Sequence, residues 1–134
     1  MVKINFNKYL NPCDEQEFIE LSYEILKEFN INTKVYIDFN EELKYLTLGR
    51  EAYDEEQEIV YIEFNPRVLD CTKEDKIDTI FHELLHAYID TNYPNEREDN
   101  RLHKGMFEKL REELGVMEIW ELNNQYSLRA TKDI

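Results

Sequence analysis

The stretch KEDKIDTIFHELLHAYIDT, residues 73–91, is the most informative part of this sequence. Its apolar residues recur at helical spacing and form a single stripe, made of Ile77, Ile80, Phe81, Leu84, Leu85 and Tyr88. Thr72, directly before the stretch, is a residue type that commonly caps a helix N-terminus. The pattern predicts an amphipathic helix over about residues 73–91, with the stripe packed against the rest of the domain.

The same helix contains an HExxH sequence, His82-Glu83-Leu84-Leu85-His86. Residues four positions apart lie about 40° apart around a helix, so the two imidazoles can bind one metal ion. They lie roughly 150–180° around the helix from the centre of the apolar stripe, which predicts that they face a cleft. Glu83 lies on the flank of the same ridge, from which its carboxylate can reach a water in the fourth coordination position.

A catalytic zinc site usually has three protein ligands, so the third must come from elsewhere. The extended pattern HExxHxxGxxH is absent, because positions 89 and 92 hold Ile89 and Asn92. The remaining histidine is His103, which we expect at the start of a helix over about residues 103–114. Sharing a helical face with Phe107 and Leu110 would turn it inward, and we favour it as the third ligand. A carboxylate could instead complete the site, and the candidates are Asp90, Glu96, Glu98, Asp99 and Glu108.

The remaining elements follow from capping and periodicity. Asp14 with Glu17 three residues later fits a capping box at the start of a helix over about residues 14–29. Alternation over residues 35–39 predicts a half-buried strand, and two further β-rich runs cover 46–53 and 59–64. The acidic stretch between these runs predicts a hairpin turn.

Other segments carry weaker signals. We expect a loop over residues 91–101 and the end of the last helix at Gly115. Residues 116–122 could form a short strand or another helical turn. The order of elements predicts an α+β fold. It has an N-terminal helix, a small antiparallel sheet of about three strands, the HExxH helix and a second metal-bearing helix.

Length and charge restrict the class of protein. The chain has 134 residues, with 30 acidic and 16 basic side chains and a formal net charge of -14. We expect one domain over residues 1–134, with a core at about 14–115 and a C-terminal extension at 116–134. The negative charge repels phosphate backbones, so direct nucleic-acid binding by this chain is not expected.

The sequence predicts a cytoplasmic protein without a membrane segment. No run approaches the ~18 apolar residues that a membrane span needs, and we find no apolar segment typical of a signal peptide. Cys13 and Cys71 form neither a disulfide framework nor a CxxC pair, so we expect reduced thiols.

Several of these motifs together resemble the SprT-like metalloprotease domain. That family combines HExxH with a third histidine in an HGxxF or HxxxF pattern at the start of the next helix, and this chain has HELLHAYID and then HKGMF at residues 103–107. Upstream, residues 46–49 (LTLG), residues 59–62 (IVYI) and the Asn65-Pro66 pair are similar to the strands before the family's active-site helix.

Over about residues 14–115, this resemblance implies a minimal zincin-like core and a zinc endopeptidase with one Zn²⁺ per chain. It implies His82, His86 and His103 as the zinc ligands, Glu83 as the general base, and a protein or peptide substrate. Many family members add a zinc ribbon with CxxC pairs, and the better-known ones act on proteins crosslinked to DNA through basic regions. This chain has no CxxC pair and is strongly acidic.

We therefore predict a zinc-dependent metallopeptidase, with two alternatives. One is a noncatalytic zinc-binding scaffold or partner-binding module on the same fold, and the other is a zinc hydrolase that acts on a different bond. Glu83 favours catalysis, because a structural zinc site has no use for that acid and is usually closed by four protein ligands.

Substrate contacts are less clearly marked in the sequence. An oxyanion donor could be a tyrosine, and the candidates by residue type are Tyr53, Tyr61, Tyr88 and Tyr93. The hairpin over residues 46–64 could present an edge strand to an extended substrate. Its acidic turn, residues 54–58, could favour basic substrates, although a solvated turn is the simpler interpretation.

Overall fold

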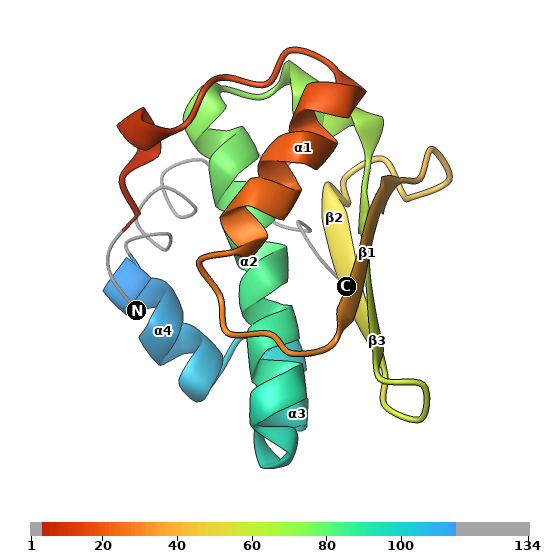
Figure 1. The fold of residues 1–134 in the computed structure, drawn as a ribbon, viewed down its shortest axis with the longest axis vertical. Helices are drawn as coiled ribbons and strands as arrows, with labels where there is room; N and C mark the ends of the chain where they lie inside the picture. The colour runs from red at the N-terminus through yellow and green to blue at the C-terminus, as the bar shows by residue number, and fades with distance from the viewer. Residues whose placement is uncertain (1–3, 115–134) are drawn as a thin grey trace.

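The computed structural model describes residues 4–114. Predictions for Gly115 and for residues 116–134 lie outside that range. Within it, four α-helices and three strands are joined by short 3₁₀ helices (η), as Figure 1 shows. In chain order the elements are η1 (Phe6–Lys8), α1 (Glu15–Leu26), β1 (Lys34–Phe39), β2 (Gly49–Asp54), β3 (Ile59–Phe64), η2 (Pro66–Asp70), α2 (Lys73–Asn92), η3 (Pro94–Glu96), α3 (Arg97–Arg101) and α4 (Met106–Leu114).

The three strands form one mixed sheet in the order β1–β3–β2. β2 is antiparallel to β3, with Gly49 opposite Phe64, as a hairpin requires. β1 is parallel to β3, with Lys34 opposite Ile59. The α+β class is therefore confirmed, whereas the expectation of an antiparallel sheet is wrong for the β1–β3 pair.

Residues 40–48 explain this topology, because they carry the chain across the end of the central strand. The backbone N–H of Asn40 donates to the carbonyl oxygen of Phe64 at 2.9 Å, and that of Asn65 donates to the carbonyl oxygen of Leu48 at 2.8 Å. The connection therefore leaves β1 on one side of β3 and enters β2 on the other. Strand periodicity alone carries no information about which strand lies in the centre.

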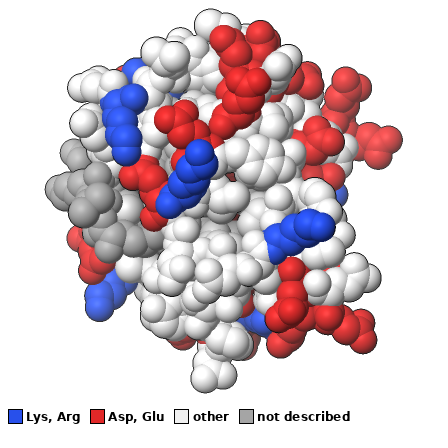
Figure 2. Space-filling model, viewed as in Figure 1, with Lys and Arg blue, Asp and Glu red and all other residues white. Residues whose placement is uncertain are grey.

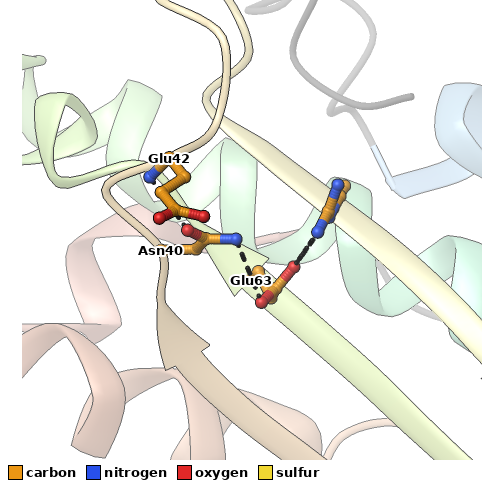
Figure 3. A network of polar contacts seen from close by, with 4 residues as sticks. Asn40, Glu42 and Glu63 are labelled. Carbon is orange, nitrogen blue, oxygen red and sulfur yellow. Dashed lines mark hydrogen bonds and ion pairs between the residues drawn. The ribbon is translucent and has the colours of Figure 1, made fainter.

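The Glu63 side chain of β3 ties this connection to the neighbouring strand (Figure 3). Asn40 Nδ2 donates to Glu63 Oε2 at 3.3 Å, and Arg50 contacts Glu63 Oε1 through Nε at 2.7 Å and Nη2 at 2.6 Å. Asn40 Oδ1 in turn accepts from the backbone N–H of Glu42 at 2.9 Å. The turn after β1 is thus held to both of the other strands.

Helices α1 and α2 cover one face of the sheet, and the hydrophobic core lies between these two layers (Figure 1). The Phe18 ring of α1 packs edge-on against Phe64, with centroids 4.8 Å apart, and lies 5.4 Å from the Phe39 ring. On the other face of the sheet, the exposed rings of Tyr36 and Tyr61 stack at 5.9 Å. The fold is therefore a two-layer arrangement with one covered sheet face.

Helix α2 confirms the predicted helix but is more deeply buried than its amphipathic pattern suggests. Its N-cap is Thr72, whose Oγ1 accepts from the Asp75 N–H at 3.2 Å. The apolar stripe is buried as expected. The face that carries His82 and His86 is buried too, because β2, α3 and α4 pack against α2. In the described part of the chain no helix, α2 included, is both long and apolar enough to cross a membrane.

The expected loop over residues 91–101 is largely helical. α2 continues to Asn92, η3 and α3 follow, and α4 begins at Met106 rather than near residue 103. His103 and Gly105 have positive φ angles of 59° and 61°, a left-handed conformation that cannot continue a right-handed helix. The sequence of α3, REDNR, has no apolar residue, so no hydrophobic period marks it.

The capping box of α1 gives the first testable prediction. Glu17 N–H donates to Asp14 Oδ1 at 2.9 Å, and Glu17 Oε1 accepts from the backbone N–H of Asp14 at 3.2 Å. We expect Asp14→Ala to lower the free energy of unfolding by about 0.5–2 kcal/mol, measured by urea denaturation. Gln16→Ala, at an exposed site in the same turn, should cost less than about 0.5 kcal/mol. Equal losses in the two variants would show that the cap is not a significant contributor.

Candidate metal centre

Three histidines, two on α2 and one from a later turn, lie close together on one side of this helix. His82 and His86 lie one turn apart on that helix, and His103 comes from the turn between α3 and α4. One ring nitrogen of each lies within 4.8 Å of those of the other two. His82 and His86 are buried and His103 is half-buried, so the cluster lies below the surface, with His103 its most exposed member.

The ring of Phe107 packs against all three imidazoles. It stacks on His86 with centroids 4.3 Å apart and an interplanar angle of 20°, and it lies 5.1 Å from His82 and 5.0 Å from His103. Phe107 is fully buried near the start of α4. A single aromatic ring therefore restricts the orientation of the three histidines without competing for their nitrogens.

Backbone hydrogen bonds hold the turn that presents His103. The N–H of His103 donates to the carbonyl oxygen of Asn100 at 3.0 Å, and that of Lys104 donates to the carbonyl oxygen of Asp99 at 2.8 Å. The φ angle of His103 is 59°, which is uncommon for a residue with a Cβ. The prediction that His103 points inward is correct in outcome, but the cause is this turn and not a shared face of α4.

Asn100 connects the two halves of the cluster. Its Nδ2 donates to the carbonyl oxygen of His86 at 3.0 Å and to Asp90 Oδ1 at 2.9 Å, and its Oδ1 lies 2.9 Å from His86 Nδ1. An amide oxygen only accepts, so His86 Nδ1 carries the hydrogen and donates it to Asn100. The Nε2 atom of His86 is then the nitrogen with a lone pair available for a metal ion.

The acids considered as a third ligand lie outside this cluster. The group of ligand atoms that the described structure brings together contains three histidines and none of those carboxylates. Asp90, the nearest along α2, is bound by the Asn100 amide. Glu83 is fully buried on α2, and its side chain lies against Gly49 at the start of β2.

A cleft of about 590 Å³ opens beside the cluster. Its walls include Glu51 and Tyr53 of β2, His86 and Asp90 of α2, and Arg97 and Arg101 of α3. The cleft therefore lies between the edge strand β2 and helices α2 and α3.

Only Tyr53 of the four tyrosines named from the sequence lines this cleft. Tyr61 is on the exposed sheet face, stacked on Tyr36. Tyr88 and Tyr93 pack together with ring centroids 5.9 Å apart, and a hydrogen bond between them raises the pKa of Tyr88.

The acidic turn between β2 and β3 contacts the opposite wall of the cleft. Arg97 Nη1 lies 2.6 Å from Glu55 Oε2, and the Arg97 guanidinium lies 5.2 Å from the centroid of the Tyr53 ring. The hydrogen bond and the charge of Arg97 hold the pKa of the Glu55 carboxyl below its ordinary value, and the same contact raises the pKa of Arg97. At least one acid of this turn is therefore not simply solvated.

Comparison with known proteins agrees with this arrangement. Residues 15–129 match the family described as the SprT-like family. The chain belongs to the SprT-like family. No curated protein and no solved structure was found to match it. In this SprT-like chain, four of the residues that carried the sequence resemblance meet at the cluster: both HExxH histidines, His103 and Phe107.

The sequence did not reveal Asn100 or Arg97 as parts of the site. Asn100 lies 14 residues from His86 in a segment predicted to be a loop, and Arg97 pairs with a residue 42 positions earlier. Neither spacing has a local period. No signal in the sequence marks either residue, because the burial of Asn100, which requires partners for its amide, is known only from the structure.

We predict that Asn100→Ala weakens zinc binding about 10- to 100-fold, because His86 loses the acceptor that orients its ring. The dissociation constant would be measured by competition with a chromogenic chelator. Asn95→Ala, at an exposed position of η3, is the matched control and should bind zinc as the wild type does. Wild-type affinity in the Asn100 variant would mean that this hydrogen bond does not position the ligand.

Proposed function

We propose that this SprT-like chain is a zinc-dependent metallopeptidase that hydrolyses peptide bonds in a protein or peptide substrate. The observation that carries the proposal is the convergence of three histidine nitrogens within 4.8 Å, on the same helix that holds the buried Glu83. The family supports the same reading at a coarser level, since it includes metallopeptidase-type domains.

The donor set fits zinc. Zinc accepts imidazole nitrogens at about 2.0–2.1 Å, and catalytic zinc sites typically have three protein ligands and one open position. His82, His86 and His103 supply three such nitrogens, and the hydrogen bond from His86 to Asn100 is the outer contact that metal-binding histidines usually make. Three neutral nitrogens leave the positive charge of the ion available for catalysis.

The proposed reaction assigns proton transfer to Glu83. Zinc, when bound, supplies the positive charge that activates a water and polarises the peptide carbonyl. The Glu83 carboxylate takes a proton from the attacking water and then donates it to the nitrogen of the departing amine. Burial of Glu83 excludes bulk water from the carboxylate, which keeps the transferred proton within the site.

The edge strand β2 is a suitable place for an extended substrate. Among the described strands, β2 pairs with β3 alone, and Glu51 and Tyr53 of β2 line the cleft. A peptide laid along this edge would form backbone hydrogen bonds and place a carbonyl near the histidines. On the face in Figure 2, acidic side chains form several groups between uncharged surface and scattered basic side chains. With a formal net charge of -14, the chain favours a polypeptide over a phosphate backbone as partner.

A noncatalytic scaffold explains these observations less well. A purely structural metal site is usually closed by four protein ligands. The cluster here contains three, beside a cleft of about 590 Å³. A fully buried glutamate is rare in proteins, and proton transfer gives Glu83 a role that a scaffold does not require.

Metal content tests the proposed ligand set. We expect about one zinc ion per chain in protein purified without chelators or nickel resin, measured by inductively coupled plasma mass spectrometry. His103→Ala should lose most of this zinc, and Glu108→Ala, an exposed acid on α4, should retain it. Full zinc content in the His103 variant would move the third ligand to a carboxylate. No zinc uptake by the wild type would contradict the zinc enzyme altogether.

Substitution of Glu83 tests the reaction. Glutamine has nearly the same shape but cannot accept the proton, so we expect Glu83→Gln to keep its zinc and to lower kcat by about 10²–10⁴-fold. Turnover would be measured on an unfolded protein and on small esters, which separates a peptidase from another hydrolase. Glu56→Gln, in the exposed hairpin turn, is the matched control. Unchanged turnover in the Glu83 variant would remove the general-base assignment.

A further inference from the structure

Gly49 is the first residue of β2 and lies against the HExxH helix, α2. A Cβ atom added there would lie 3.2 Å from both Cγ and Oε2 of Glu83, and 3.1 Å from Cδ1 of Phe64. These separations are shorter than the roughly 3.5–4.0 Å at which non-bonded carbon atoms attract each other best. A side chain at position 49 therefore fits only if one of these neighbours moves.

Space, and not backbone conformation, explains the glycine. Gly105 has a φ of 61°, which a residue with a side chain adopts only with strain, whereas Gly49 lies in an ordinary strand conformation opposite Phe64. Alanine could adopt the backbone angles of Gly49. The methyl group of alanine would instead need Glu83 or Phe64 to give by a few tenths of an ångström.

Glu83 is the neighbour most able to move. The Phe64 ring is fully buried and packs against the Phe18 ring at 4.8 Å, so it has little room to shift. The start of β2 is held by its pairing with β3 and by the Asn65 N–H, which donates to the carbonyl oxygen of Leu48 at 2.8 Å. Glu83 is also fully buried, but its carboxylate is the far end of a side chain with three rotatable bonds, so it can shift more readily than a packed ring or a paired strand.

We propose that Gly49 is a positioning residue for Glu83: the missing side chain determines where the Glu83 carboxylate lies. This inference rests on the proposed function, in which that carboxylate is the general base. A general base must lie about 2.6–3.2 Å from the atom whose proton it takes. The added methyl group requires its neighbours to give by a few tenths of an ångström, and because a displacement of about 1 Å can lower the rate by about 10²-fold, a smaller loss is expected here. A methyl group at position 49 therefore acts on the rate of reaction and not on zinc binding.

The first arm of the test separates kcat from KM. We expect Gly49→Ala to lower kcat on an unfolded protein substrate by roughly 3- to 10-fold, with KM and zinc affinity changed less than about 2-fold. Val60→Ile is the matched control, because it adds one methyl group to the buried part of β3, opposite Tyr53 and not Gly49. Wild-type kcat in the Gly49 variant, or an equal loss in the Val60 variant, would overturn the positioning role.

The second arm needs no activity at all. Urea unfolding of the zinc-free protein would be compared for wild type, Gly49→Ala, Glu83→Ala and the double variant. Glu83→Ala removes both Cγ and Oε2, so the added methyl group should lower the urea midpoint less in that background than in the wild type. If Gly49→Ala alone does not fold, recovery of folding in the double variant supports the proposal.

An equal midpoint shift in both backgrounds, or a double variant that also fails to fold, would overturn the contact between Gly49 and Glu83. The two arms also separate this inference from the proposed function. A wild-type chain without hydrolytic activity refutes the peptidase, and the unfolding comparison still decides whether position 49 is shaped around Glu83. An active enzyme whose Gly49→Ala variant keeps its kcat refutes the positioning role alone.

Discussion

Burial of α2 on both of its sides is the constraint on which the rest of the structure depends. Its apolar stripe faces the core formed with α1 and the sheet, and its histidine face is covered by β2, α3 and α4. A helix face with two imidazoles and a carboxylate is unfavourable to bury unless neighbouring groups bond to it. The segments that pack on this face must therefore supply both polar partners and apolar surface, and the residues after position 92 do both.

Asn100 and Phe107 divide these two tasks. Asn100 satisfies the His86 ring, the His86 carbonyl group and Asp90 with a single buried amide. Phe107 provides the apolar surface on which the His82, His86 and His103 rings rest. Both contacts are made by protein atoms, so the protein itself orients the three histidines, and a metal ion held there would cost little further conformational freedom.

The sequence predicted what depends on local spacing. The capping box at Asp14, the HExxH helix and the hairpin all follow from patterns within a few residues. The parallel pairing of β1 could not be predicted in this way, because it depends on which side of β3 the 40–48 connection reaches. His103 was predicted to face inward from the first turn of a helix, but α4 begins only at Met106. The position of His103 is set by the turn before α4, which backbone hydrogen bonds to Asn100 and Asp99 hold in place.

Two of the charged side chains that line the cleft, Arg97 and Asp90, are engaged by other parts of the protein. The guanidinium of Arg97 is already engaged by Glu55 and the Tyr53 ring, and the nearby charge of Asp90 also favours its protonated form. Asp90 is in turn bound by the Asn100 amide. A charged side chain of a ligand would have to compete with these contacts, whereas an extended backbone at the edge of β2 would not. In the proposed peptidase, these two contacts therefore favour recognition of the substrate through its backbone.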